Sequence, residues 1–556
     1  MFDTTRTTAR VPAAVSGLVA AGAAVAVAEV VAVIMGRSDV TPLLAVGDAT
    51  VDLTPLPVKQ FAVDTFGTAD KIALFVGMGA IMVVAAALLG AAAGRRRRIG
   101  AAGLAAFAVV GLAAVLTRPG AGVLDTVPTL VGTAACYLVL ILLLNAGARQ
   151  ETVGLTPLGA DPAASTESGG TGEGDGAEQS VGSGGPADAP RGAPGFDRRR
   201  FVLLAGSAAA LSAGAGTTAR LFAASGPGTR TGVGDISLPR PSDPAAPLPD
   251  GADLELDGLS SFFTPNDDFY RIDTALSVPR LDASTWSLRI HGNGVEERTY
   301  TYEDLLNRPD LVERDITIAC VSNPIGGDLI GNARWIGVPL ATLLEEVGVV
   351  PPSRGGRADQ LVSRSSDGMT IGTPVEDVMD GRDAMLALGM NGEPLPYDHG
   401  FPVRMVVPGL YGYVSACKWL VDIDVTTFDA FDAYWVPRGW SARGPIKTQS
   451  RIETPRSGDA LTTGTVAVAG VAWAQTTGIE RVEVSIDGGE WREAELAAED
   501  TADTWRQWVY EWDAEPGDHE ISVRATDRDG ETQTDEQAPV APDGATGRHT
   551  VQVTVA

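Results

Sequence analysis

The 556-residue chain is poor in cysteine, lysine and histidine, and these shortages exclude several classes of site. Its three cysteines, Cys136, Cys320 and Cys417, are too few for a disulfide framework, and no Cys-x-x-Cys or Cys-x-x-Cys-His occurs. Iron–sulfur clusters, covalently attached haem and structural zinc are therefore not expected. The four histidines stand at 291, 399, 519 and 549. The chain before residue 290 thus offers no histidine pair that would ligate a haem.

Lysine occurs only at 59, 71, 418 and 447, and the formal net charge of the chain is -28. Such acidity argues against nucleic acid as a partner and against peripheral binding to an anionic membrane surface. An acid-rich, lysine-poor composition favours a salt-adapted protein from a halophile. A GC-rich genome, which favours arginine codons, is the alternative explanation.

Four long apolar segments open the chain, at 11–35, 72–94, 99–116 and 126–144. Each is close to the roughly 20 residues that a helix needs to cross a bilayer. Arg6 and Arg10 precede the first segment, four arginines at 95–98 separate the second from the third, and Arg149 follows the fourth. These charges fall on one side if every segment crosses, and the positive-inside rule makes that side cytoplasmic. Residues 1–149 therefore predict a four-helix transmembrane region.

Two further segments connect this region to the rest of the chain. Residues 150–197 are rich in Gly, Ser, Pro and acidic side chains, which predicts a disordered cytoplasmic linker. Residues 198–222 begin with three arginines and Phe201 and continue as a mildly apolar run, which resembles a twin-arginine export signal. An ordinary fifth transmembrane helix is the alternative, and four preceding spans favour an uncleaved segment. Both interpretations place everything after about residue 223 outside the cytoplasm.

The remaining chain predicts two soluble domains after a proline-rich linker at 223–250. Within 251–445, residues 286–306 predict two strands around a Gly-Asn-Gly turn followed by a helix start, and 338–349 show helical spacing of apolar residues. From 446 to 556, alternating apolar runs are separated by Gly and Asp turns. They predict an antiparallel β-sandwich of immunoglobulin type.

Cys320 ends a β-like apolar run at 316–319 and opens a loop rich in Gly, Asn and Pro. At such a position a thiol is open to four roles: a nucleophile, a metal ligand, half of a disulfide or a packed side chain. A cysteine nucleophile needs a nearby base, and His399 is the histidine in the most suggestive context. On these residues alone a buried structural cysteine has the strongest claim.

Two longer motifs make the chain similar to a known family. ACVSNPIGGDLIGNARWIGVPLATLL at 319–344 and HGFPVRMVVPGLYGYVSACKWL at 399–420 together resemble the molybdopterin-binding domain of the sulfite oxidase family. The resemblance covers roughly residues 255–440 and continues into the sandwich, where 446–459 resemble the start of the family's dimerisation domain. It implies an α+β molybdopterin domain, an immunoglobulin-like domain after it, and a possible homodimer through that second domain.

The resemblance implies a role for each matching residue. Cys320 matches the cysteine whose thiolate ligates molybdenum beside the pterin dithiolene, and a soft thiolate suits a redox metal. Arg271, in the segment FYRID, together with His399, Arg404 and Lys418, match residues that contact the pterin and its phosphate. Cationic side chains suit this role because the cofactor is an anion, and arginine grips a phosphate through two hydrogen bonds.

The chain departs from the family pattern near the substrate. The family commonly carries Cys-x-x-Asn-Arg-Arg, whereas here Asn323, matched to the cofactor site, is retained and Pro324 and Ile325 replace both arginines. This change weakens the case for sulfite as the substrate. Arg334 is a candidate for the missing charge or, alternatively, a buttress of the loop. Asp273 stands where the family often has histidine.

Tyr434 is a candidate catalytic residue that would line the substrate pocket with Trp435, and Tyr411 and Tyr413 are the alternative pair. A disulfide between Cys320 and Cys417 would consume the metal ligand, so we expect Cys417 to be a packed free thiol.

These implications define the expected function: a membrane-anchored, extracytoplasmic oxidoreductase that holds molybdenum–molybdopterin and transfers an oxygen atom to or from a small substrate. Oxidation of sulfite is one form, and reduction of a sulfoxide or N-oxide is the other. Because no haem is expected in this chain, electrons must pass through a separate partner: a cytochrome, a copper protein or a quinone-linked subunit. A non-catalytic surface binding or adhesion protein, and a cysteine hydrolase that uses Cys320 and His399, are alternatives from other classes.

Overall fold

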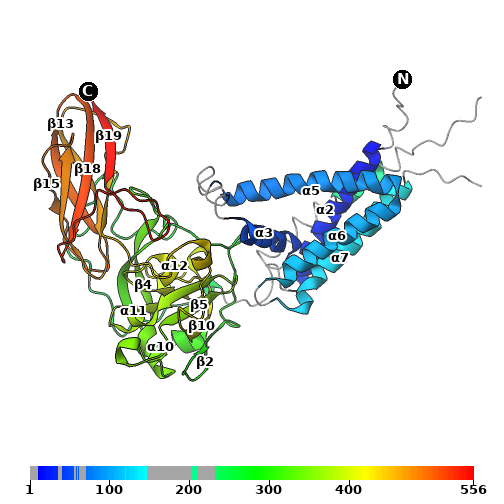
Figure 1. Ribbon diagram of the computed structural model, residues 1–556, viewed down its shortest axis with the longest axis horizontal. Coiled ribbons are helices and arrows are strands. Elements are labelled where there is room, and N and C mark those ends of the chain that lie inside the picture. The colour runs from blue at the N-terminus through cyan, green and yellow to red at the C-terminus, as the bar shows by residue number, and fades with distance from the viewer. Residues whose placement is uncertain are drawn as a thin grey trace, which may run out of the picture. The chain divides into compact units, whose positions relative to one another are not determined.

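The computed structural model describes residues 10–35, 41–55, 58, 61, 70–118, 121–146, 202–210 and 232–556 (Figure 1). It contains two compact units, one formed by the N-terminal helices and one that consists mainly of residues 227–556.

Among the described residues of the N-terminal unit, four helices are long and apolar enough to cross a membrane: α2 (Arg10–Ile34), α5 (Asp70–Arg95), α6 (Arg97–Leu116) and α7 (Val127–Ala146). They coincide within a few residues with the four predicted spans. A fifth helix, α3 (Pro42–Leu53), was not expected from the sequence, and its 12 residues are too few to cross a bilayer.

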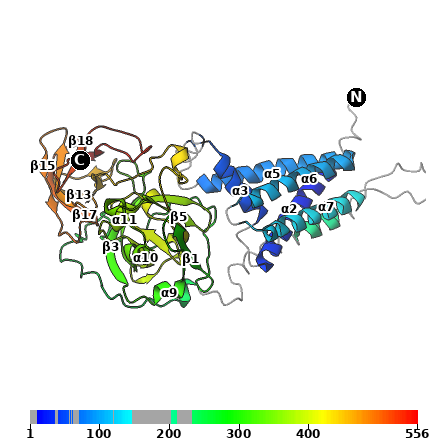
Figure 2. The ribbon, with the colours of Figure 1, turned by 60° about the horizontal axis from the view of Figure 1, so that its bottom comes forward.

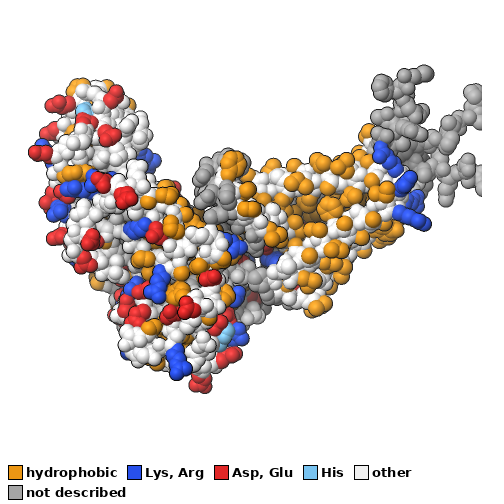
Figure 3. Space-filling view, in the orientation of Figure 1, with side chains coloured by type: hydrophobic (Ala, Val, Ile, Leu, Met, Phe, Trp, Pro, Cys, Tyr) orange, Lys and Arg blue, Asp and Glu red, His pale blue; other side chains and the backbone are white. Residues whose placement is uncertain are grey.

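Small residues let α2 lie close to its neighbours α5 and α7. A Cβ atom at Gly17 of α2 would overlap the backbone at Gly90 of α5, and the converse also holds, so glycine is required where these helices cross. The large apolar side chains of α5, α6 and α7 point outwards, and they cover the helical unit in Figure 3. Such an apolar outer surface is compatible with helices that face lipid.

The basic residues gather at one end of this unit (Figure 3). The four arginines at 95–98 are exposed between α5 and α6. Arg97 donates a hydrogen bond to Asn145 at the end of α7 (2.5 Å). The ends of three predicted spans therefore meet at one basic edge, as the charge pattern predicted; Arg6 and Arg149 lie outside the described residues.

Residues 202–210 are helical, and Ala205 is buried in a small cluster with Leu143 of α7 and Val15 of α2. The predicted linker 150–197, the arginines at 198–200 and residues 211–231 lie outside the described residues. The twin-arginine signal and the fifth span stay predictions.

The α/β domain holds two sheets of five strands each (Figure 1). The first has the order β2 (Arg298–Thr301), β1 (Ser287–Gly292), β10 (Leu420–Thr426), β5 (Gln360–Ser365), β6 (Thr370–Pro374), with β1 and β10 parallel. The second has the order β3 (Val312–Ala319), β4 (Ile330–Pro339), β7 (Met385–Met390), β8 (Glu393–Pro394), and β9 (Arg404–Val406) also pairs with β7. Because β3 and β4 are buried along most of their length, their apolar runs fix both ends of the loop that starts at Cys320.

Short helices cover these sheets: α9 (Tyr302–Leu306), α10 (Leu340–Glu346), α11 (Val375–Met379) and α12 (Gly412–Ser415). Single 3₁₀ turns lie at Val123–Thr126, Val233–Asp235, Pro352–Arg354, Tyr397–His399 and Val436–Arg438. Leu343 of α10 and Leu386 of β7 are fully buried in the single large core of the domain. The strand–turn–strand–helix expected at 286–306 and the helix expected at 338–349 are both present.

The C-terminal domain is a two-layer β-sandwich (Figure 2). One sheet has the order β11 (Gln449–Thr454), β13 (Gly464–Trp473), β17 (Arg506–Ala514), β16 (Glu495–Leu496). The other has the order β12 (Ala460–Leu461), β19 (His549–Val555), β18 (Gly517–Asp527), β14 (Ile479–Ile486), β15 (Arg492–Glu493). Alternate residues of both sheets, such as Val468, Trp508, Ile521 and Val553, meet in one core. The predicted fold class, apolar helices followed by an α+β domain and an immunoglobulin-like sandwich, is confirmed.

Candidate functional site

Cys320 directly follows β3 and stands at the base of a closed loop. Its backbone N–H donates to the carbonyl of Leu329 (2.9 Å), and its carbonyl accepts from the N–H of Asn323 (3.1 Å). The residue is 8% exposed, and its Sγ lies 3.0 Å from Ser322 Oγ. A buried strand and a loop that folds back on it therefore hold this thiol in one place.

Asn323 shapes that loop. Its side-chain oxygen accepts from the backbone N–H of Leu329 (2.9 Å), and a Cβ at Gly327 would collide with the same amide. Asn323 is 5% exposed. The side chain of Asn323 is bound to the loop backbone, so its contact with the cofactor, which the resemblance implied, stays a prediction.

Burial raises the pKa of the Cys320 thiol, whereas the hydrogen bond from Ser322 and the nearby charge of Lys418 act in the opposite direction. A thiol in this state gives up its proton when a metal ion binds, because ligation requires the thiolate. The arrangement suits a metal ligand.

Arg404, on β9, is a buried cation with an incomplete set of partners. It is 5% exposed, its Nη1 donates to the carbonyl of His399 (3.2 Å), and its guanidinium lies 5.0 Å from the centre of the Trp335 ring. Its Nε is buried without a hydrogen-bond partner, and no carboxylate among the described residues pairs with it. Burial lowers the pKa of Arg404 to about 10. A buried charge of this kind is unfavourable unless an anion is bound beside it.

Lys418 and Arg271 share one carboxylate. Lys418 Nζ lies 2.7 Å from Asp273 Oδ2, and Arg271 Nε lies 3.1 Å from the same oxygen. Arg271 also reaches Asp398 (2.6 Å). Burial, together with the charges of Arg404 and Arg271, lowers the pKa of Lys418 to about 8, although Asp273 acts in the opposite direction. The position of Asp273, where the family often has histidine, thus anchors two of the predicted cofactor contacts.

His399 lies in the 3₁₀ turn before β9 and is 5% exposed. Its Nε2 is 2.7 Å from the backbone carbonyl of Asn266, and its ring packs edge-to-face on Phe269. Burial lowers the pKa of His399 to about 4, so the ring is neutral at pH 7 and Nε2 carries the proton that it donates. Because this nitrogen is bound to a carbonyl and Sγ of Cys320 contacts Ser322, the geometry does not favour a Cys320–His399 hydrolase.

Two tyrosines belong to the surroundings of the thiol. The pKa of Tyr270 is raised by burial and by the charge of Cys320, and lowered by Arg404, so its phenol lies within range of both groups. Tyr411 is 4% exposed, and burial, Asp543 and Cys320 raise its pKa to about 12. Sequence reasoning noted Tyr411 as a candidate but missed Tyr270, although it directly precedes Arg271 in the FYRID segment.

The remaining candidates take part in local contacts. The ring of Tyr434 lies against Trp435 (5.1 Å between ring centres) and 3.6 Å from the guanidinium carbon of Arg438. Its role as a catalytic residue stays a prediction. Arg334 forms a two-pronged ion pair with the buried Asp315 on the neighbouring strand (2.7 and 2.8 Å). Arg334 therefore supports β3 rather than supplying free charge.

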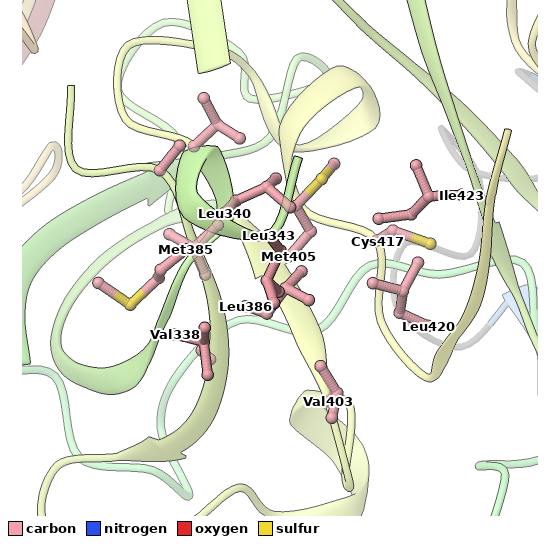
Figure 4. Packing of buried hydrophobic residues seen from close by; sticks show 14 of the residues in the cluster. Val338, Leu340, Leu343, Met385, Leu386, Val403, Met405, Cys417, Leu420 and Ile423 are labelled. Atoms are coloured by element: carbon pink, nitrogen blue, oxygen red, sulfur yellow. The ribbon is translucent and has the colours of Figure 1, made fainter. Parts of the chain in front are cut away.

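Cys417 is a free thiol that is 2% exposed. Figure 4 shows it close to Leu420 and Ile423 in the core of the α/β domain. The expectation of a packed free thiol is confirmed, and Cys320 is likewise unpaired.

These residues fit a molybdopterin cofactor. The cofactor is an anion, and the unsatisfied Nε of Arg404 marks a place where an anionic oxygen would complete the hydrogen bonding of a buried cation. The charge of Lys418 lowers the pKa of the Cys320 thiol, and the charge of Arg404 lowers the pKa of Lys418. Lys418 is therefore within electrostatic range of both the soft ligand and the second cation.

Comparison with known proteins agrees with this geometry. The family model described as the oxidoreductase molybdopterin binding domain matches residues 275–435, and the model described as a bacterial Ig domain matches residues 449–523. The first match contains Cys320, His399, Arg404 and Lys418. The second covers most of the sandwich.

Curated relatives include sulfite oxidases from several animals and a plant. Mitochondrial sulfite oxidase of Homo sapiens is 30% identical over 324 residues, which cover 50% of this chain and 59% of the human protein. Sulfite oxidase of Gallus gallus is 30% identical over 322 residues, which cover 50% of this chain and 70% of the chicken protein. Among solved structures, the sulfane dehydrogenase SoxCD of Paracoccus pantotrophus is 25% identical, with a TM-score of 0.45 over 52% of this chain and 81% of that chain. The chain belongs to the sulfite oxidase family of molybdopterin-dependent oxidoreductases.

Proposed function

We propose that this protein is a membrane-anchored, extracytoplasmic molybdenum oxidoreductase that moves an oxygen atom between water and a small substrate. In the oxidative direction, the substrate and one water give the oxygenated product, two protons and two electrons; the reductive direction is the reverse. The observation that carries the proposal is the buried thiol of Cys320, within electrostatic range of Lys418, together with the buried, incompletely paired guanidinium of Arg404.

Bound molybdenum–molybdopterin would supply the two-electron exchange of an oxygen atom. Cys320 would ligate the metal, and Arg404 and Lys418 would hold the anionic part of the cofactor. Asp273 keeps Lys418 in place through an ion pair of 2.7 Å. The neutral His399 orders the same region, because its backbone carbonyl fixes Arg404 while its ring is fixed by the carbonyl of Asn266. Arg271 lies at the more exposed edge of this set.

The membrane anchor rests on the four apolar helices and on the arginines at one end of them. The positive-inside rule makes the end with the arginines at 95–98 cytoplasmic. A fifth crossing within 202–222 would then place residues 227–556 outside the cytoplasm. The net charge of -28 and the scarcity of lysine favour a salt-adapted protein.

A separate electron carrier completes the proposed function. Two electrons must leave or enter for each oxygen atom, and we propose a cytochrome, a copper protein or a quinone-linked subunit as the partner. Sulfite is the first oxidative candidate substrate, and a sulfoxide or an N-oxide is the first reductive one. Dimerisation through residues 446–556 belongs to the same proposal.

The test is the molybdenum content of the full chain, purified in detergent from a host that makes molybdopterin. We expect about one molybdenum per chain in the unmodified protein, as for a resident cofactor. Cys320→Ser should abolish turnover and change the electron paramagnetic resonance signal of the metal, and the control Cys417→Ser should change neither. A folded unmodified protein without molybdenum would refute the proposal and favour a non-catalytic binding protein.

A further inference from the structure

A cavity of about 320 Å³ lies beside the loop that starts at Cys320. One wall consists of Pro324 and Ile325 from this loop, and the other consists of residues between 537 and 546, which precede β19 of the sandwich. Every lining residue is uncharged, and most are apolar. Its volume falls at the lower end of the roughly 300–1,000 Å³ that small-molecule sites occupy.

Both walls adjoin the surroundings of the thiol. Pro324 and Ile325 belong to the loop that closes on Cys320 through the hydrogen bonds of Leu329 and Asn323. On the other side, the phenol of Tyr411 would lie only 2.7 Å from a Cβ at Gly544, and the same phenol is within electrostatic range of Cys320. The cavity therefore lies next to the site where the cofactor would bind.

The sandwich holds the second wall in place. Gln449 donates to the carbonyl of Ala545 (2.6 Å), and Gly544 N–H donates to the carbonyl of Val540 (2.7 Å). Lys447 is paired with Asp543 (3.0 Å) and donates to the carbonyl of Gly544, and Arg548 is paired with Asp535 (3.6 Å). The ionic groups beside this wall thus neutralise each other.

The sandwich also holds the first wall. Arg451 donates to the carbonyl of Gly327 (2.6 Å), and the ring of His549 packs directly on Gly326, whose φ of +73° also favours glycine. Two segments more than 200 residues apart in sequence are therefore fixed against each other, and the apolar character of the cavity is built into the fold.

We propose that this cavity is the substrate pocket and that it selects a neutral organic molecule with apolar substituents, of the thioether and sulfoxide class, over an oxyanion such as sulfite. The inference rests on the proposed function. An oxyanion that leaves water needs cations or N–H donors to replace its hydration, and uncharged walls that are mostly apolar supply few. Apolar substituents gain free energy on the same walls.

The reaction balances in both directions. A thioether and water give a sulfoxide, two protons and two electrons, and the sulfur lone pair forms the new S–O bond. The electrons pass to the one-electron carrier of the proposed function, for which ferricyanide stands in during an assay. In reverse, a sulfoxide, two protons and two electrons give the thioether and water, with a reduced viologen as the electron donor.

The test compares methyl phenyl sulfide and sulfite as substrates of the full, molybdenum-loaded chain in detergent, with ferricyanide as the acceptor. We expect kcat/KM for the sulfide to exceed that for sulfite by about tenfold or more. Ile325→Arg should reverse this preference, because it places a cation in the wall. The control Val350→Arg changes an apolar side chain that is 45% exposed, and it should leave the ratio unchanged. Calorimetric titration should show the same order, with methyl phenyl sulfoxide bound more tightly than sulfate.

Each other outcome refutes a specific step. A kcat/KM for sulfite equal to or above that for the sulfide would overturn the pocket assignment while leaving the proposed function intact. An unchanged preference in Ile325→Arg would do the same. If that variant does not fold, Val540→Arg places the charge in the opposite wall and repeats the test. Absence of turnover with every substrate by a folded, molybdenum-loaded protein would overturn the proposed function itself.

Discussion

Arg404→Met is expected to stabilise the cofactor-free protein and to abolish its ability to retain the cofactor. The guanidinium is 5% exposed, makes one hydrogen bond to His399 and leaves Nε without a partner. Burial lowers its pKa from 12.5 to about 10. This change corresponds to roughly 3 kcal/mol of destabilisation of the charged form in the folded state at neutral pH.

Methionine removes that charge and keeps an unbranched side chain against Trp335. Some packing and the hydrogen bond to His399 are lost, which offsets part of the gain. We therefore expect the free energy of unfolding of the cofactor-free protein to rise by about 1–3 kcal/mol. The same variant from a molybdopterin-making host should contain little molybdenum, because it lacks the cation that we propose as a contact of the anionic cofactor.

The assay is denaturant unfolding of the full chain in detergent, followed by tryptophan fluorescence. All ten tryptophans lie between Trp286 and Trp512, so the signal reports on the unit that consists mainly of residues 227–556 and not on the N-terminal helices. Arg334→Met is the matched control: it would leave the buried carboxylate of Asp315 without its ion-pair partner and should destabilise the protein.

Two results would refute this reasoning. If Arg404→Met destabilises the cofactor-free protein as much as Arg334→Met does, Arg404 is a structural residue and its orphaned Nε marks no anion site. If Arg404→Met retains the molybdenum content of the unmodified protein, the guanidinium does not bind the cofactor.

Three further predictions concern the site and the contacts of the sandwich. Burial lowers the pKa of His399 and of His549 from 6.5 to about 4, so the stability that each neutral ring contributes is complete above pH 6.5 and is lost as the pH falls through 4, by roughly 3 kcal/mol each. The free energy of unfolding of the cofactor-free protein, compared at pH 7 and pH 4.5, measures this loss. An equally steep loss in His399→Gln would contradict the prediction. Asp273→Asn removes a carboxylate that raises the pKa of Lys418, so this pKa should fall below its present value of about 8. Molybdenum retention by the variant during gel filtration should then be weaker at pH 8 than at pH 6. Retention that does not vary with pH would count against Lys418 as an anion contact. The buried side chain of Gln475 in the sandwich donates a hydrogen bond to the carbonyl of Thr317 on β3 (2.5 Å). Gln475→Ala removes this donor and should lower the free energy of unfolding by about 1–3 kcal/mol. An unchanged free energy of unfolding would show that the contact has no structural role.

Much of the fold was accessible from the sequence because the relevant signals are local. A span must contain about 20 apolar residues, so the four N-terminal helices were visible as uninterrupted runs. The sandwich strands were visible as alternating apolar runs between turns. β19 buries every second side chain, as the pleat of a strand implies, whereas the last six residues of β13 are all buried. The short helix α3 was missed, since 12 moderately apolar residues satisfy neither pattern.

The candidate site was accessible in its residue types but not in its contacts. Cys320, His399, Arg404 and Lys418 were identified through the family motifs, which specify residues by their order along the chain. Tyr270 was missed because an aromatic side chain before Arg271 carries no signal of its own. Its proximity to both Cys320 and Arg404 depends on how distant segments pack.

The sequence by itself determined which cations, thiols and apolar runs this protein has to place. The apolar runs predicted the N-terminal helices and the sandwich, and the resemblance to the sulfite oxidase family implied the α+β domain between them. Only the tertiary structure decided which arginine has a counter-ion. Arg334 and Arg404 both stand among apolar residues in the sequence, but strand pairing brings Asp315 opposite Arg334 and no carboxylate opposite Arg404. Only the tertiary structure, too, brought residues 537–546 against the loop of Cys320. The physical reason is the same in both cases: electrostatic and apolar contacts depend on distance in space, which sequence separation does not specify.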